Sequence, residues 1–507
     1  MNSNKYQTVI GLEVHVHLKT VTKLFCRCRN EFGGVPNTHI CPVCTGQPGS
    51  LPVINKQAVK QATKAALVLG CEIQRTSGTV KRRIDEKGKY VFESGTTGTF
   101  DSVFSRKQYF YPDLPKNYQI SQYEKPLAVD GKVFLEEASI LLTRVHMEED
   151  AGKLIHTEGD ISLVDYNRTG APLIEVVTEP RIDSPRKASE YLKRLRQILR
   201  YCDISDCDME KGSMRCDANI SLKKSDDTQL GTKVEIKNMN SFKAVEKALE
   251  YEVLRIAKLL DEGEKIIQET RLWDESRSMT FSMRSKEEAH DYRYFPDPDL
   301  PSLIIEDALI DEIGTELPKE LPLDRKHRYM EAPLCLSDYD AEVLTQDKVV
   351  ADYFEEALKG LKVHSPGCAG KLSNWITVEL FGMINSQGIE FSDQPVKPEY
   401  MAELIEFIED GKISGKMAKD IIREIWDTGK SPFCIIEEKG LKQITSYDEI
   451  EKICQGVIDD NPGIVKKYLD GKEGVIGALV GGVMKKTQGQ ANPNRVNEKL
   501  KEILKGK

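Results

Sequence analysis

The sequence lacks any apolar run long enough to cross a membrane. The longest, Gly474 to Met484, has eleven residues, four of them glycine, whereas a membrane-spanning helix needs about 20 apolar residues. The first residues, MNSNKYQTVIG, hold no apolar signal region and lead directly into a strand pattern. We therefore expect a cytoplasmic protein with no membrane contact.

The common phosphate-binding and nucleophile motifs are also missing. The chain has neither a GxxxxGKS/T loop nor a GxGxxG turn after a strand. It has no GxSxG elbow and no Ser- and Gly-rich stretch of the kind that amidases use. A phosphate site must therefore be built from side chains, and any ammonia that the chain uses must be released by another protein.

Length and composition indicate a large globular protein. The 507 residues allow about three domains, and 39% hydrophobic residues suffice for a sizeable core. With 72 basic and 81 acidic residues the net charge is −9, so any contact with a nucleic acid must be local. The 12 cysteines are expected to be thiols, because disulfides are rare in the cytoplasm.

Strands and helices mix in the first part of the chain, and helices dominate afterwards. The segment from Ile10 to Leu18 alternates apolar and polar residues, as a half-buried strand does. Helices are expected over 57–69, from Ser184 onward, and from Ser241 to about residue 261. Three prolines in residues 294–303 mark a domain boundary. The sequence predicts an α+β protein with domains at 1–298, 299–430 and 431–507.

Four cysteines form the most specific local motif. Cys26 and Cys28 are followed, twelve residues later, by the turn Cys41-Pro-Val-Cys44. Four thiolates in two tight pairs suit tetrahedral zinc, and the alternative is four buried cysteines without a metal. Such a site leaves no open position for water, so we expect this zinc to be structural. The other eight cysteines are expected in the core.

Polar residues recur at alternate positions in several further segments. Side chains two residues apart on a strand project to the same side, about 6–7 Å apart. If these strands pair, one face carries imidazole, carboxylate, amide and cationic groups, which suit magnesium and phosphate. These residues are His15, Glu148, Glu149, Asp150, Glu175, Arg215, Asp217, Asn219, Glu235 and Lys237.

The same alternation is typical of the solvated face of an antiparallel sheet. Two features favour a site. Glu175 stands where an apolar residue would fit, and the run Glu148-Glu149-Asp150 concentrates charge that a solvated face would disperse. We expect His17 to be a surface residue.

Eight segments, in order, carry a family resemblance. They are VIGLEVHVHLKT, CPVCTGQPGSLPVINK, YFYPDLPKNYQISQ, HMEEDAGK, GAPLIEVVTEP, GSMRCDANISL, EIKNMNSF and DYRYFPDPDLP. Together they closely resemble the B subunit of the aspartyl/glutamyl-tRNA amidotransferases, and GQANP near residue 490 fits the same family's tail.

The resemblance implies both a fold and an activity. We expect an antiparallel-sheet cradle distantly like glutamine synthetase, then a helical domain and a small helical tail that bind tRNA. The family uses ATP to phosphorylate the side-chain carboxylate of Glu on tRNA(Gln) or Asp on tRNA(Asn). Ammonia from an amidase, the A subunit of the complex, then displaces phosphate to give the amide, and a small C subunit completes a heterotrimer.

The resemblance also assigns roles to residues, motif by motif. Magnesium is expected to be coordinated by Glu13, His15, Glu149 and Glu175, with Glu148 nearby. ATP is expected near Glu210, Arg215, Asp217 and Asn219, with Lys237 as a weaker addition. Metal and cations would offset the charge of phosphoryl transfer.

Two departures from the family pattern limit this mapping. Residues 76–103 look longer than the family's usual connection, and we expect an exposed hairpin or mobile insertion over 76–102. Ser105 replaces the Asp that is common before the RKxYFYPD segment. The role of the insertion does not follow from the sequence.

The sequence is compatible with two other functions. A zinc-stabilised tRNA-binding scaffold would use the basic helix 185–200 and the basic tail from Lys485, but it leaves Glu175 and the acidic run unexplained. A metal-dependent nuclease would use the same carboxylates to cleave tRNA. The sequence does not say whether Glu-tRNA, Asp-tRNA or both are substrates, nor which residues line an ammonia tunnel or recognise the tRNA.

Overall fold

The computed structural model describes most of the chain and divides it into two compact units. These units are Met1–Leu323 and Asp324–Lys507, and each is treated by itself. The residues described are 5–84, 90–95, 100–157, 161–224, 227–285, 292–361, 366–440, 447–469, 472–487, 491 and 493–505.

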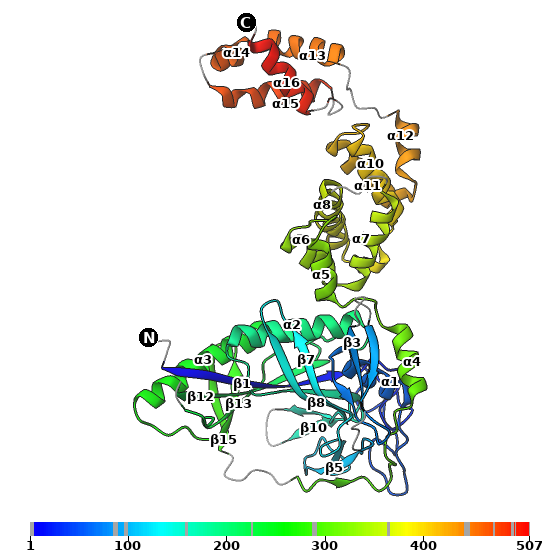
Figure 1. Ribbon diagram of the computed structural model, residues 1–507, viewed down its shortest axis with the longest axis vertical. Coiled ribbons are helices and arrows are strands. Elements are labelled where there is room, and N and C mark those ends of the chain that lie inside the picture. Colours follow the sequence, from blue (N-terminus) through cyan, green and yellow to red (C-terminus); the bar gives the residue numbers. More distant parts are fainter. Residues whose placement is uncertain are drawn as a thin grey trace. The chain divides into compact units, whose positions relative to one another are not determined.

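The first unit is built on an 11-stranded sheet (Figure 1). Neighbouring strands run antiparallel except β13 and β14, which are parallel. This agrees with the expected antiparallel sheet. In spatial order the strands are β15 (Met279–Ser285), β14 (Glu269–Asp274), β13 (Val234–Lys237), β12 (Met214–Lys224), β1 (Tyr6–His17), β11 (Pro172–Thr178), β8 (Ser139–Glu149), β7 (Ala128–Phe134), β2 (Glu72–Ile73), β3 (Val80–Ile84) and β4 (Tyr90–Ser94).

Strand β1 gives the sheet one apolar and one polar face, as its alternation predicts. Ile10, Leu12 and Val14 are buried in the core, whereas Glu13 and His15 lie half-buried on the other face. Because successive side chains point to opposite faces, the polar face continues across the paired strands.

Helices α1 (Lys56–Val68), α2 (Pro185–Tyr201) and α3 (Phe242–Asp261) pack on the apolar face, where α2 and α3 lie along the sheet (Figure 1). All three expected helices are confirmed. The Ser184 hydroxyl accepts a hydrogen bond from the backbone N–H of Lys187, and the Ser241 hydroxyl does the same at α3. Each serine therefore satisfies a backbone donor at the start of its helix.

The expected hairpin in residues 76–102 is present as β3 and β4. It extends the main sheet through β2, and Phe92 packs against the core, so the hairpin is less exposed than expected. Residues 85–89 and 96–99 of this segment lie outside the described part of the chain.

The first unit ends later than the proline-rich segment. Helix α4 (Asp307–Glu316) packs on α1, and Lys60 Nζ lies 2.6 Å from the Glu312 carboxylate. Residues beyond 298 therefore belong to the compact unit that ends at Leu323.

Two smaller sheets complete the first unit. One pairs β9 (Lys153–His156) with β10 (Ser162–Asp165). The other joins β16 (Phe295–Pro296), β5 (Ser105–Gln108) and β6 (Tyr118–Ser121).

The second unit is helical, as expected. Its buried apolar residues form two clusters, one from Tyr329 to Ile435 and one from Ile450 to Leu504. No helix in the described ranges is long and apolar enough to cross a membrane. The elements are α5 (Pro322–Met330), α6 (Asp338–Thr345), α7 (Lys348–Gly360), α8 (Pro366–Asn374), η1 (Trp375–Leu380), α9 (Phe381–Gln387), η2 (Phe391–Asp393), α10 (Pro398–Glu409), α11 (Gly415–Thr428), α12 (Pro432–Lys439), α13 (Tyr447–Asp460), α14 (Pro462–Leu469), η3 (Glu473–Val475), α15 (Ile476–Lys486) and α16 (Pro493–Lys505).

Candidate functional site

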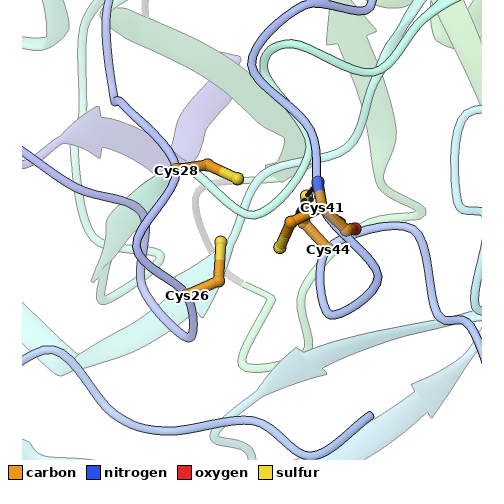
Figure 2. Close-up of side chains that lie close together, drawn as sticks. All are labelled: Cys26, Cys28, Cys41 and Cys44. Carbon is orange, nitrogen blue, oxygen red and sulfur yellow. Dashed lines mark hydrogen bonds between the residues drawn. The ribbon is translucent and has the colours of Figure 1, made fainter.

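The four clustered cysteines lie together on two loops that precede α1. Cys26 and Cys28 face Cys41 and Cys44 across a common centre (Figure 2). The four Sγ atoms all lie within 4.8 Å of one another. The Cys41 backbone N–H donates to the Cys44 sulfur at 3.2 Å. This geometry fits the four-thiolate donor set that zinc prefers in structural sites.

A buried lysine adjoins the cysteine cluster. Lys23 is fully buried, and its ammonium lies 3.8 Å from the Cys44 sulfur and donates to the His39 carbonyl at 2.7 Å. A hydrogen bond from Cys26 and the charge of Lys23 lower the pKa of the Cys44 thiol to about 5. One divalent zinc with four thiolates carries two negative charges, and Lys23 would offset part of them.

A second cluster lies on the polar face of the main sheet, where β8, β11 and β1 are neighbours. Glu175 on β11 lies opposite His15 on one side and His146 on the other. His15 Nε2 lies 3.2 Å from Glu148 and 3.7 Å from Glu175, and His146 Nε2 lies 3.0 Å from Glu175. His15, Glu148 and Glu175 offer one ligand atom each, all within 4.8 Å of one another.

The charges in this cluster are strongly coupled. Burial alone would lower the pKa of His15, but the hydrogen bond to Glu148 and the charges of Glu148 and Glu175 raise it to about 9. Burial opposes ionisation of Glu148, yet His15 lowers its pKa, and His146 lowers that of Glu175. Without a metal, the protonated imidazole of His15 therefore lies between the two carboxylates and offsets part of their charge.

Glu149 does not belong to this cluster, which corrects the expectation that it shares a metal ion with His15 and Glu175. Successive residues of a strand point to opposite faces, so Glu149 faces away from Glu148. Its carboxylate pairs with Lys116 and accepts the backbone N–H of Ile120 at 2.9 Å.

Further along the polar face, β1, β12 and β13 bring together a second set of polar groups. Asn219 Nδ2 donates to Glu13 at 2.9 Å, and Lys237 Nζ lies 2.7 Å from Asp217 and 3.3 Å from Glu235. Burial, and then the negative charges of Glu175, Asp217 and Glu235, raise the pKa of Glu13. The face therefore carries an excess of negative charge that suits a cation.

Asp150, just beyond β8, contacts two guanidinium groups and one imidazole at the edge of this face. Its Oδ2 lies 2.6 Å from Arg215, 2.8 Å from His17 and 3.2 Å from Arg168. Burial opposes ionisation of Asp150, but the charges of Arg215 and Arg168 hold its pKa far below the ordinary value. His17 is therefore half-buried and paired, so the expectation of a surface residue is wrong.

The remaining expected residue, Glu210, lies in an exposed turn before β12. Its backbone N–H bonds to Asp208 at 2.9 Å. The described contacts do not bring its side chain to the other expected ATP residues.

Comparison with known proteins covers nearly the whole chain. Residues 8–98 and 89–311 match a family described as the GatB/GatE catalytic domain, and residues 352–504 match the GatB domain. A protein of Carboxydothermus hydrogenoformans, named as the B subunit of aspartyl/glutamyl-tRNA(Asn/Gln) amidotransferase, is 51% identical over 99% of each chain. The chain belongs to this family. The B subunits of Persephonella marina (51% identical, covering 99% of this chain and 100% of the relative) and Thermoanaerobacter pseudethanolicus (48%, 99% of each) are similarly close.

The part that matches the catalytic domain of the amidotransferase B subunits contains both clusters. Reasoning from the sequence missed two features of the polar face. They are the presence of His146 and the contacts of Asp150 with Arg215, His17 and Arg168. The alternation Arg144, His146, Glu148, Asp150 could have found both, since it places all four side chains on the face opposite Glu149.

Proposed function

We propose that this chain is the kinase-and-amidation subunit of a tRNA-dependent amidotransferase. It uses ATP to phosphorylate the side-chain carboxylate of Glu on tRNA(Gln), of Asp on tRNA(Asn), or of both. Ammonia from a partner amidase then replaces the phosphate to form Gln-tRNA or Asn-tRNA, a carbon–nitrogen ligation. The observation that carries the proposal is the cluster of His15, Glu148 and Glu175 on a charged sheet face.

Magnesium fits this cluster by its donor set. Glu148 and Glu175 supply the carboxylate oxygens that magnesium prefers, His15 supplies a nitrogen, and Glu13 stands beside them. When bound, magnesium would stabilise the negative charge on the transferred phosphoryl group. Glu149 takes no part in this proposal.

The contacts of Arg215 support a role for it in binding a phosphate of ATP. Asp150 holds one guanidinium nitrogen at 2.6 Å, while the buried Nε of Arg215 has no hydrogen-bond partner among the described residues. A buried donor without a partner is costly, and a phosphate oxygen would satisfy it. Lys237, Asp217 and Asn219 line the same face and would complete the nucleotide site, with Glu210 at its margin.

Zinc fits the four thiolates of Cys26, Cys28, Cys41 and Cys44, and we assign it a structural role. The site ties two loops together next to Gly170, in the turn before β11. Four sulfurs complete the tetrahedral coordination of zinc, so no coordination position is left for water or a substrate.

Membership of a family named as B subunits supports a wider assembly. We propose a heterotrimer with the amidase (A) and small (C) subunits of the amidotransferase, acting in the cytoplasm on Glu-tRNA(Gln) or Asp-tRNA(Asn). We also propose that the sheet unit is a cradle like that of glutamine synthetase, and that a helical domain and a tRNA-binding tail (residues 431–507) follow it. The sequence predicts this helical domain over 299–430, but residues up to Leu323 pack with the sheet unit.

A scaffold without phosphoryl transfer is not favoured. Glu148 is buried and Glu175 nearly so, and burying two carboxylates is expensive unless cations pair with them. A protein that only binds tRNA would gain nothing from that cost, and negative charge repels the RNA backbone.

The test measures phosphate release by the chain reconstituted with its amidase and small subunits. Release from ATP is followed with and without Glu-tRNA(Gln) and ammonium, for the parent, Glu175→Gln and Glu250→Gln. Glu250 is an exposed residue of α3, on the opposite face of the sheet, so its variant is the matched control.

The proposal expects release that requires charged tRNA, persists in Glu250→Gln and falls by at least about 100-fold in Glu175→Gln, the size typical of losing a metal's charge stabilisation. Unchanged release in Glu175→Gln would remove this residue from the site. Intact tRNA binding without tRNA-dependent release would support the scaffold, and tRNA cleavage would support the nuclease.

A further inference from the structure

Five tyrosines form a continuous row, here called the tyrosine row. Tyr111 stacks on Tyr109 with ring centroids 4.9 Å apart, and Tyr109 meets Tyr292 edge-on at 6.0 Å. Tyr292 meets Tyr294 at 6.2 Å, and Tyr294 stacks on Tyr123 at 4.5 Å with the ring planes 12° apart. Segments far apart in the sequence thus contribute to one aromatic surface.

The small sheet of β16, β5 and β6 brings these segments together. The backbone N–H of Gln108 donates to the carbonyl of Tyr292 at 2.9 Å, and β16 pairs with β5 directly after Tyr294. Strand β6 contacts β8, where the Ser121 hydroxyl donates to Glu148 at 3.3 Å. The tyrosine row therefore stands beside the proposed metal cluster.

Electrostatics agree with this placement. Burial and then the charges of Glu148 and Glu175 raise the pKa of Tyr294. Burial raises the pKa of Tyr109, and the charge of Lys237 acts in the opposite direction. The row thus runs near both halves of the polar face.

The tyrosine row is more exposed than a buried core cluster, and cationic side chains lie near its rings. Tyr111 is 44% exposed and Tyr123 is 49% exposed. Lys107 Nζ lies 4.9 Å from the Tyr292 ring centroid, and the Arg144 guanidinium carbon lies 5.3 Å from that of Tyr123. Exposed aromatic rings interleaved with cations are typical of surfaces that stack unpaired nucleobases.

We propose that the tyrosine row stacks an adenine ring beside the metal cluster. The inference rests on the proposed function, in which two substrates bring adenine to this face. One is ATP, and the other is the unpaired nucleotide at the 3′ end of the tRNA, which carries the amino acid. Stacking either base would fix its phosphate or its aminoacyl group relative to Glu148 and Glu175.

A protein partner is the competing occupant, because tyrosine is also enriched at protein interfaces. The neighbouring cations favour a nucleobase, since Lys107 and Arg144 suit the phosphates that accompany every nucleotide. Adjacency to Glu148 favours it as well, because a reacting substrate must reach that cluster.

The test removes the exposed rings of the row and keeps the rest. Tyr111→Leu and Tyr123→Leu lose the ring, while Tyr111→Phe and Tyr123→Phe keep a stacking face without the hydroxyl. Phe134→Leu is the matched control, because Phe134 is a 59% exposed ring with Lys132 Nζ 5.1 Å from its centroid.

Two binding measurements on the reconstituted complex separate the two sources of adenine. Equilibrium dialysis gives the Kd of radiolabelled ATP. Fluorescence gives the Kd of Glu-tRNA whose terminal adenine is replaced by 2-aminopurine, which is quenched when it stacks. Alanine scans of stacking sites predict a loss of about tenfold per base.

The inference predicts a rise of about tenfold in one Kd for each Leu variant, with Phe variants and Phe134→Leu near the parent. A rise for ATP alone assigns the row to the ATP base, and a rise for tRNA alone, with lost quenching, assigns it to the 3′ end. A rise for both assigns it to both.

Three results would overturn the inference. They are unchanged Kd values in the Leu variants, equal losses in the Phe variants, and dissociation of the partner subunits from the Leu variants, which would identify a protein interface. Failure of the proposed function is separate, since the parent would then bind both ligands but show no tRNA-dependent phosphate release.

Discussion

Replacing Asp150 with Asn should destabilise the first unit in a way that depends on pH. The Asp150 carboxylate is buried, makes hydrogen bonds with Arg215 and His17, and forms an ion pair with Arg168. An Asn side chain keeps one oxygen acceptor but loses the negative charge, so both hydrogen bonds are weakened and the ion pair with Arg168 is lost.

The magnitude follows from these contacts. A hydrogen bond to a charged group contributes about 1.5–3 kcal/mol and a neutral one about 1 kcal/mol. Arg215 and Arg168 are each 37% exposed, which screens their contribution, so we expect a loss of about 3 kcal/mol at pH 7. With an unfolding entropy of about 2.1 cal/mol/K per residue, this lowers the midpoint of a unit of this size by about 4 °C.

The pH dependence has a definite sign. The Arg215 and Arg168 charges lower the pKa of folded Asp150, so its stabilising contribution is complete above about pH 5 and is lost as pH falls. The unfolded residue titrates near the ordinary pKa of about 3.9. The gap between parent and Asp150→Asn should therefore shrink by about 1 kcal/mol between pH 7 and pH 3.

Urea unfolding of the full chain at pH 7, 5 and 3, followed by circular dichroism, measures this gap. Asp206→Asn is the control, because Asp206 is exposed. An Asp150→Asn midpoint equal to that of the parent at pH 7, or a gap that stays constant down to pH 3, would refute the reasoning.

Three further predictions concern the two clusters. The purified chain should contain one zinc by mass spectrometry, and the Cys44→Ser variant should lose this zinc and unfold at a lower temperature. The control is Cys335→Ser, which should retain zinc because Cys335 is exposed. A full zinc content in Cys44→Ser would disprove the site. Because the pKa of His15 is raised to about 9, magnesium must displace the imidazole proton in order to bind. Calorimetry should therefore show proton release on binding and a magnesium affinity that rises from pH 7 to 9. A magnesium affinity that does not change with pH would argue against His15 as a ligand. Glu148→Gln should weaken magnesium binding at least about tenfold. Glu149→Gln should leave magnesium affinity intact but lower the thermal midpoint, because it breaks the buried ion pair with Lys116. Weaker magnesium binding in Glu149→Gln and not in Glu148→Gln would restore Glu149 to the site.

The sequence predicted the sheet face but not every side chain on it. Alternation in β1 and β12 is a property of consecutive residues, so Glu13, His15 and Arg215 could be placed from the sequence alone. In the run Glu148-Glu149-Asp150 each residue is acidic, so composition does not say which ones face the cluster. The pairing of β8 with β11 decides this, because it places Glu148 opposite Leu173, on the face of Glu175.

Contacts between distant segments could not be predicted from the sequence. The pairing of His17 with Asp150 joins two strands that are not neighbours in the sheet order. The tyrosine row depends on β16 pairing with β5, and α4 belongs to the first unit because of its packing on α1. No local sequence pattern predicts these contacts, because each one depends on which distant segments the fold brings together.

The end of β8 has a mechanical consequence. Glu148 and Glu149 share one rigid peptide plane yet contact opposite faces, one beside the proposed metal cluster and the other beside Lys116 and the cysteine loops. A shift of either residue must move the other. Loss of the zinc proposed for the four thiolates should therefore also move Glu148 on the opposite face, so we expect the two clusters to be mechanically coupled.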